Sequence, residues 1–339
     1  MKYLVTGTAG FIGFHVAKAL TEQGNEVIGI DNFNDYYDVS LKEARNAILE
    51  KYPKYTIYRG DLADLKFVQH VFEKEKPQKV CHLAAQAGVR YSIINPHAYV
   101  QSNMVGFVNI MHTAKEHGVE NFVYASSSSV YGKNKKTPFS VEDNVDHPIS
   151  LYAASKKSNE LMAHAYHHLY GMKMAGLRFF TVYGEWGRPD LSIFKFTKAM
   201  IEGRPIDVYN YGDMWRDFTY IADIVSGVLA SLYKNYDYEI FNLGNNNTER
   251  LEDMISYIED ELGIKAKKNY MGMQPGDVYM TYADISASRE KLGYEPKTKL
   301  RNGIKKFIEW YKIFYRVETP KNVTISKIKE QKKNLSVKK

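Results

Sequence analysis

The stretch Tyr3-Leu4-Val5-Thr6-Gly7-Thr8-Ala9-Gly10-Phe11-Ile12-Gly13 decides the fold of this chain. A short apolar run, typical of a buried strand, leads directly into three glycines spaced Gly-x-x-Gly-x-x-Gly, and a helical pattern follows as far as Gln23. Glycine permits the tight turn and lets backbone N–H groups approach a phosphate, and a helix N-terminus favours an anion. This context predicts a dinucleotide-binding turn, and its predicted cofactor contacts are Gly7, Gly10, Phe11, Ile12 and Gly13.

Strand and helix patterns alternate over the first half of the chain. Further strands are predicted at 26–30, 55–59, 79–83, 121–125 and 174–179, and helices at 67–74, 100–117 and 150–170. Alternation of this kind indicates an α/β fold, a doubly wound parallel sheet with right-handed crossovers. We predict an NAD-binding Rossmann domain over 1–176 and a smaller substrate-binding domain over 177–317, with some of its strands returning to the main sheet.

Composition narrows the classes of protein that the chain can belong to. Its 339 residues are 44% hydrophobic and 25% charged, which is ordinary for a globular protein. Much of the net charge of +7 comes from lysines in 318–339, a basic tail that we expect to be disordered. We therefore predict no nucleic-acid partner.

With a single cysteine, Cys81, and no leader or membrane-length apolar run, we expect a cytoplasmic protein without a membrane span. We predict no metal site.

The ends of three predicted strands carry the remaining cofactor candidates. Asp31 closes the second strand 18 residues after Gly13, a position that suits a carboxylate accepting from both ribose hydroxyls. Such a carboxylate repels a 2′-phosphate, so NAD is favoured over NADP. The alternative is that Asp31 serves only as a turn residue beside Asn32. The candidates at these strand ends are Asp31, Asn32, Asp61, Leu62, Leu83, Ala84 and Ala85.

A Tyr-Ala-Ala-Ser-Lys run contains a candidate catalytic pair. Tyr152 and Lys156 are four residues apart in a predicted helix and therefore share a face. A nearby ammonium, like the positive nicotinamide ring, favours the phenolate of a tyrosine, which could then remove a hydroxyl proton. With 27 tyrosines, the chain could contain this spacing by chance. The run Ser126-Ser127-Ser128-Ser129, about 25 residues earlier at the end of a predicted strand, argues against chance.

Ser-Ser-Ser-Ser-Val-Tyr-Gly followed by Tyr-x-x-x-Lys resembles the extended short-chain dehydrogenase/reductase family of nucleotide-sugar enzymes. The resemblance implies catalytic roles for Ser127, Tyr152 and Lys156, with Ser127 hydrogen-bonded to the reacting hydroxyl. Members that eliminate water usually carry Asp-Glu at the next two positions, and decarboxylases a Glu at the second. Here those positions are Ser128 and Ser129, which favours oxidation and re-reduction of one carbon.

Longer stretches resemble one group of that family, the UDP-glucuronate 4-epimerases. They are 31–37, 85–92, 180–189 and 274–278, and they extend the resemblance to about residue 315. Glu185 is a departure, since the group usually has proline there. The resemblance implies a UDP-sugar substrate and a homodimer formed through helices at 100–117 and 151–170. It also implies substrate contacts from Arg90, Ser127, Ser128, Thr181, Arg188 and Arg216, among which Arg188 suits a carboxylate.

The hypothesis is an NAD-dependent epimerase that inverts C4 of UDP-glucuronate through a 4-keto intermediate. Three alternatives stay open. They are an epimerase of UDP-GlcNAc or UDP-glucose, a UDP-glucuronate decarboxylase, and a catalytically silent NAD-binding sensor or scaffold.

Overall fold

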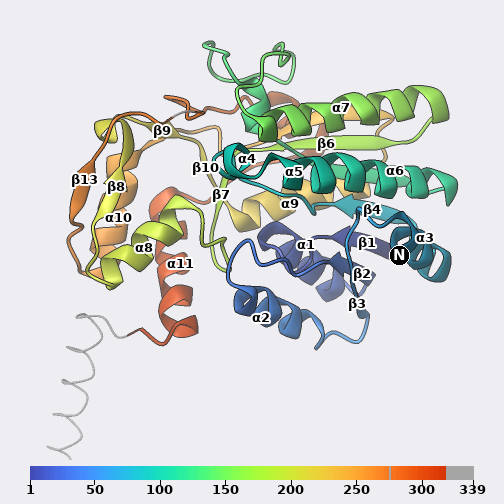
Figure 1. The fold of residues 1–339 in the computed structure, drawn as a ribbon, viewed down its shortest axis with the longest axis horizontal. Coiled ribbons are helices and arrows are strands. Elements are labelled where there is room, and N and C mark those ends of the chain that lie inside the picture. The colour runs from blue at the N-terminus through green and yellow to red at the C-terminus, as the bar shows by residue number, and fades with distance from the viewer. Residues whose placement is uncertain (275, 318–339) are drawn as a thin grey trace, which may run out of the picture.

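A seven-stranded parallel sheet forms the centre of the protein (Figure 1). The computed structural model describes residues 1–274 and 276–317, so the predicted tail at 318–339 lies outside the described residues. The strand order is β11-β6-β5-β4-β1-β2-β3, and every neighbouring pair is parallel. The bounds are β1 Lys2–Thr6, β2 Glu26–Asp31, β3 Tyr55–Arg59, β4 Lys79–His82, β5 Asn121–Ser127, β6 Met174–Phe179 and β11 Tyr238–Leu243. The predicted fold class is confirmed.

The order of the strands fixes where a ligand can bind. The chain moves outward from β1 through β2 to β3 and then crosses to β4 on the other side of β1. In such sheets ligands bind beyond the carboxyl ends of the strands at this reversal. Thr6 pairs with His82 at the ends of β1 and β4, so the glycine turn after β1 lies beside the segment that begins at Leu83.

Helices cover both faces of the sheet. On one face α3 packs against α6, and α6 against α7; on the other, α1 packs against α2 and α9. Their bounds are α1 Phe11–Glu22, α2 Val39–Leu49, α3 Leu65–Glu75, α6 Gly106–Glu116, α7 Leu151–Tyr170 and α9 Ile221–Tyr233. Two short helices, α4 Tyr91–Ile94 and α5 Pro96–Tyr99, and a π-helical segment at Val100–Val105 lead into α6. No helix was predicted from the sequence at the positions of α2 and α9.

The C-terminal half of the chain contributes to two places. Strand β11 returns to the main sheet beside β6. The remaining elements form two-stranded sheets and helices to one side, namely β7 Thr181–Tyr183 with β10 Phe218–Tyr220, β8 Ile206–Val208 with β13 Lys268–Tyr270, β9 Trp215–Arg216 with β12 Glu249–Arg250, and the helices α8 Ser192–Ile201, α10 Leu251–Leu262 and α11 Leu300–Phe314 (Figure 1). The boundary predicted between 176 and 177 falls inside β6, and the division into two domains stays a prediction.

Candidate active site

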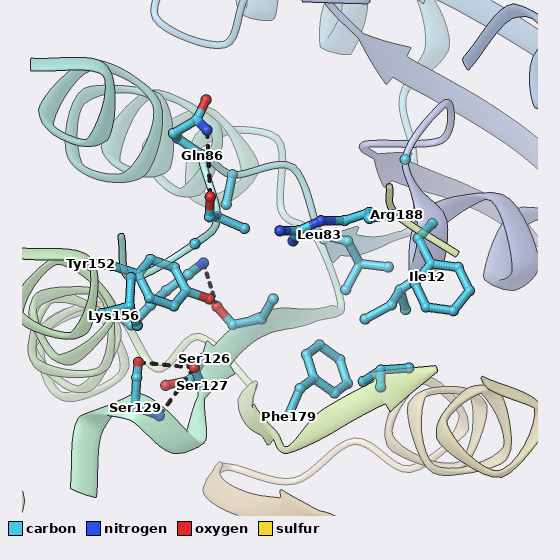
Figure 2. A pocket seen from close by; sticks show the side chains of 18 of the residues that line it. Ile12, Leu83, Gln86, Ser126, Ser127, Ser129, Tyr152, Lys156, Phe179 and Arg188 are labelled. Carbon is cyan, nitrogen blue, oxygen red and sulfur yellow. Dashed lines mark hydrogen bonds between the residues drawn. The ribbon is translucent and has the colours of Figure 1, made fainter. Parts of the chain in front are cut away.

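A cavity of about 460 Å³ lies at the carboxyl ends of the central strands (Figure 2). It joins the glycine turn to the serine run and to loops of the C-terminal half. The predicted site residues that line it are Gly7, Gly10, Phe11, Ile12, Gly13, Asp31, Asn32, Asp61, Leu62, Leu83, Ala84, Ala85, Ser127, Ser128, Tyr152, Lys156, Thr181, Arg188 and Arg216. Arg90, the remaining predicted site residue, does not line the cavity itself. Its guanidinium pairs at 3.0 Å with Asp277, which does line the cavity.

The glycine turn is packed so closely that side chains would not fit. Gly7 has φ +78°, and a Cβ on it would lie 2.9 Å from the backbone nitrogen of Ala84. A Cβ on Gly13 would lie 2.0 Å from the carbonyl oxygen of Gly7. The first turn of α1 is thereby brought against the end of β1, and its residues Phe11, Ile12 and Gly13 line the cavity. This cradle fits the diphosphate of a dinucleotide.

Asp31 is buried beside the cradle at the end of β2. Its Oδ2 accepts from Ala9 N at 3.0 Å and its Oδ1 from Phe33 N at 2.9 Å. Burial raises the pKa of Asp31, while these hydrogen bonds and the nearby Lys42 and Arg45 oppose the rise. Since each carboxylate oxygen can accept more than one hydrogen bond, the group can still accept from ribose hydroxyls. Asn32 donates to Asp61 at 2.9 Å and so ties the ends of β2 and β3 together.

Tyr152 and Lys156 lie in the first turns of α7, facing the serine run at the end of β5 (Figure 2). Ser150 begins this helix by accepting from Ala153 N at 3.1 Å. The ammonium of Lys156 donates to Ala125 O at 2.9 Å, and burial lowers its pKa to about 8. Burial raises the pKa of Tyr152, and a hydrogen bond with Ser127 lowers it. The geometry therefore brings a phenol, a hydroxyl and an amine together at the inner end of the cavity.

Ser129 is a polar residue of the site that sequence reasoning left without a role. Its N–H and its hydroxyl both lie near Ser127 Oγ, at 3.1 and 2.9 Å, and Ser127 Oγ accepts from them. With its oxygen engaged in this way, Ser127 can direct its own proton toward Tyr152 or a ligand. Its position two residues along the same serine run was the signal that could have identified it.

The substrate candidates of the C-terminal half come from loops and short strands. Arg188 forms an ion pair with Asp190, in which its Nε donates at 2.9 Å and its Nη2 donates to the other carboxylate oxygen. This pairing uses one edge of the guanidinium and leaves Nη1 outside the pair. Arg216 Nη1 donates to Trp215 O and Tyr279 O at 2.9 and 3.0 Å, and burial lowers its pKa.

Glu185, the departure from the usual proline, has its own partners. Its two carboxylate oxygens lie 2.9 and 2.8 Å from the hydroxyl of Tyr220, which donates to them. Its backbone oxygen lies 2.9 Å from Nε2 of His15 on α1. The glutamate is therefore accommodated by a tyrosine at the end of β10, and the backbone here is held against the first helix.

Neither a membrane-spanning helix nor a metal-binding cluster is found within residues 1–274 and 276–317. None of the helices in these ranges has both the length and the apolar character that a bilayer crossing needs. Nor do three or more His, Cys, Asp or Glu side chains gather there in an arrangement suited to a metal ion.

Comparisons with known proteins find relatives over most of the chain. The family model described as GDP-mannose 4,6 dehydratase matches residues 4–307. UDP-glucuronate 4-epimerase 4 of Arabidopsis thaliana is 48% identical to this chain over 330 residues, which cover 92% of the chain and 75% of that protein.

Solved structures of two epimerases are similar throughout. UDP-glucuronic acid 4-epimerase from Bacillus cereus, in complex with UDP-glucuronic acid and NAD, has a TM-score of 0.88 at 34% identity, covering 93% of this chain and 100% of that one. UDP-glucose 4-epimerase from Thermotoga maritima, with UDP-glucose, has a TM-score of 0.85 at 30% identity over the same shares. The chain therefore belongs to the GDP-mannose 4,6 dehydratase family of extended short-chain dehydrogenases/reductases, as its serine run and Tyr-x-x-x-Lys motif indicated.

Proposed function

We propose that this protein is an NAD-dependent UDP-glucuronate 4-epimerase. The observation that carries the proposal is the meeting, in one cavity, of the glycine cradle with Ser127, Tyr152 and Lys156. The relatives add the substrate, since UDP-glucuronate 4-epimerases match over nearly the whole chain. When bound, NAD supplies a hydride acceptor that later returns the hydride, so it is not consumed.

The chain's own residues would handle the proton of the 4-hydroxyl. Tyr152 removes that proton, and Ser127, whose oxygen already accepts from Ser129, positions the hydroxyl. Burial, together with the charge of Asp190, raises the pKa of Tyr152, whereas Ser127 and the positive charge of Arg188 lower it, so this step depends on positive charge near the phenol. Lys156 supplies such a charge from α7, four residues along the same helix face. Inversion follows when the 4-keto sugar turns over before it is reduced on its other face.

The acidic sugar sets a second requirement. A 4-keto uronate is a β-keto acid, and it loses CO2 when the bond to its carboxylate aligns with the ketone π system. We propose that Ser128, Thr181 and Arg188 hold the carboxylate out of that alignment, a restraint worth several kcal/mol in favourable cases. The proposed contacts of the UDP diphosphate are two further arginines. Arg216 lines the cavity, and Arg90 pairs with Asp277 beside it.

The activity named by the family model is not the one we propose. Family members that eliminate water usually carry Asp-Glu, as acid and base, after the catalytic serine, and hydroxyls cannot exchange protons near neutral pH as carboxyl groups do. In this chain Ser128 and Ser129 occupy those positions, and both line the cavity. Neither dehydration nor enzymatic decarboxylation is therefore favoured.

One observation favours a second candidate, an epimerase of neutral sugars such as UDP-glucose. The pairing of Arg188 with Asp190 leaves less of the guanidinium free for a substrate carboxylate, and a UDP-glucose 4-epimerase has a closely similar fold.

Product analysis separates these candidates. The purified protein is incubated with UDP-glucuronate, UDP-glucose and UDP-GlcNAc in turn, and the products are identified by NMR. We expect UDP-galacturonate from UDP-glucuronate, with no net reduction of NAD. Turnover of neutral sugars alone supports the second candidate, a UDP-pentose product indicates decarboxylation, and no turnover of any sugar indicates a silent binding protein.

We also propose a homodimer in the cytoplasm. Along the segment at 100–117 and on α7, large apolar side chains are exposed, with Val108 at 37%, Leu161 at 59% and Leu169 at 65%. Exposed apolar residues gathered on neighbouring helices are typical of an interface. Light scattering after size-exclusion chromatography should give twice the chain mass for the wild type. Leu161→Lys should then shift the protein toward the monomer, and a wild-type monomer would refute the dimer.

A further inference from the structure

Arg45 joins two parts of the cavity wall that are far apart in the sequence. It is fully buried on α2, and its Nη1 donates to Ala9 O in the glycine turn at 2.8 Å. Its Nη2 donates to Trp186 O at 2.6 Å and to Gly187 O at 3.3 Å. One guanidinium therefore binds the cofactor cradle and the loop at 185–190 at the same time. We call this loop the strap.

The far end of the strap is fastened by a second set of contacts. Asp190 pairs with Arg188 of the same loop, and its Oδ2 accepts from the hydroxyl of Tyr36 at 3.3 Å. Tyr36 belongs to the segment after β2, whose neighbours Asn34 and Tyr37 line the cavity. The loop after β4 also meets this junction, because a Cβ on Gly88 would lie 3.0 Å from Tyr36 Oη and 3.9 Å from Asp190 Oδ2.

Apolar packing holds the middle of the strap. The ring of Trp186 lies 5.6 Å from that of Phe14 on α1, and 5.2 and 5.0 Å from those of Trp310 and Phe314 on α11. Trp186 has φ +61°, a left-handed conformation that costs free energy for a bulky residue and persists only where its surroundings impose it. These contacts hold the middle of the strap against α1 and α11.

We propose that Arg45, Tyr36 and Asp190 are positioning residues that fasten the strap across the cofactor cleft and thereby set how long a bound dinucleotide stays. Gly10 and Ile12 line the cleft, and so do Arg188 of the strap and Leu191, the residue that follows the strap. A dinucleotide between them cannot leave until the strap lifts. Lifting breaks the bonds of Arg45 to Trp186 and Gly187 and the bond of Tyr36 to Asp190.

The test measures the rate at which NAD leaves the protein, without any sugar. Protein loaded with radiolabelled NAD is mixed with an excess of unlabelled NAD, and the label that stays bound is followed with time. We expect Asp190→Asn to accelerate release about two- to tenfold, because a neutral amide accepts a weaker hydrogen bond from Tyr36 than a carboxylate does. Arg45→Lys keeps the charge but loses the planar fork that reaches both carbonyls, so it should have a comparable effect. Tyr36→Phe removes one hydroxyl and should accelerate release about two- to tenfold.

A matched control lies on the same helix. Glu43 of α2 pairs with Arg59 on the exposed surface, away from the strap, so Glu43→Gln should leave the release rate unchanged. Release from all three strap variants within about twofold of wild type overturns the proposal, and so does equal acceleration by Glu43→Gln. If Asp190→Asn or Arg45→Lys does not fold, Tyr36→Phe decides by the same threshold. Because no sugar is present, the result is independent of the proposed epimerase activity.

Discussion

The two sides of the cavity are built in different ways. On the proposed cofactor side, much of the wall is backbone, since Gly7, Gly13 and the segment from Leu83 approach so closely that a Cβ would overlap a neighbouring backbone atom. On the proposed substrate side, the wall includes charged side chains such as Arg188 and Arg216, each held by partners from loops. One side can bind any ligand that presents a diphosphate to N–H groups, whereas the other can change its specificity by single substitutions.

This difference predicts different responses to mutation. A change in the backbone wall should affect cofactor binding and stability together, because packing and binding use the same atoms. A change in the side-chain wall should affect the choice of sugar, and it should leave the cofactor bound where the strap contacts of Arg45, Tyr36 and Asp190 stay in place. Tyr152 and Lys156 lie where the two sides meet, in the first turns of α7.

The largest effect is expected for Tyr152→Phe, at this meeting point. The change removes one hydroxyl, so the fold and bound NAD should survive, while turnover should fall about 100- to 10,000-fold, the usual contribution of an acid–base group. Turnover of UDP-glucuronate and the NAD content of the denatured protein measure the two parts. Turnover within a few-fold of wild type would show that another group removes the proton, and loss of NAD would show that the two sides are not separable.

The backbone side could be predicted from the sequence because its signals are local. The turn from Gly7 to Gly13 is specified by consecutive residues between a strand pattern and a helix pattern. Asp31 is found by its distance from that turn, since the length of a βαβ unit is constrained. Tyr152 and Lys156 share a helix face through their spacing alone. All of these residues line the same cavity in the structure.

The side-chain wall could not be predicted in the same way. The pairing of Arg188 with Asp190 engages Nε and Nη2 of the guanidinium with a carboxylate of the chain itself, a contact that was not predicted. Arg45 reaches Trp186, 141 positions later, and no local pattern indicates such a contact. It also lies on α2, where no helix was predicted. Long-range polar contacts depend on how loops pack, which spacing along the chain does not encode.

Arg188→Ala tests the side-chain wall directly. Truncating one partner of a buried charge pair costs about 2–5 kcal/mol, and we expect a loss of this size in kcat/KM for UDP-glucuronate, with little loss for UDP-glucose. Some product should appear as a UDP-pentose, because the carboxylate is less restrained. Since Arg188→Ala also leaves Asp190 unpaired, the double variant Arg188→Ala with Asp190→Ala is the control, and both are assayed with excess NAD because loss of Asp190 is expected to speed NAD release. Equal losses for acidic and neutral sugars would refute the carboxylate role of Arg188.

Gly13→Ala tests the backbone wall. The new methyl group would overlap the carbonyl oxygen of Gly7, and overpacking of this kind typically costs about 1–3 kcal/mol of stability. We expect urea unfolding to report that loss and the purified protein to contain less NAD. Gly272→Ala is a matched control, because no atom lies within 4 Å of its added Cβ. An alanine at position 13 with normal stability and normal NAD content would mean that the turn is not closely packed in solution.

The smallest effect concerns Lys156 and shows how much free energy its burial costs. In the folded protein its pKa is about 8, below the ordinary value of 10.5, because burial disfavours the charged form. Between these values the unfolded chain binds more protons than the folded one, so the stability that Lys156 contributes rises with pH and is lost as pH falls through 8. With bound NAD removed, wild type should gain about 1–2 kcal/mol over Lys156→Met between pH 8 and roughly pH 9.5. Urea unfolding at several pH values measures this difference. Parallel pH curves for the two proteins would mean that Lys156 is solvated or paired in solution, and the meeting point of the two walls would then be more open to water than its buried geometry indicates.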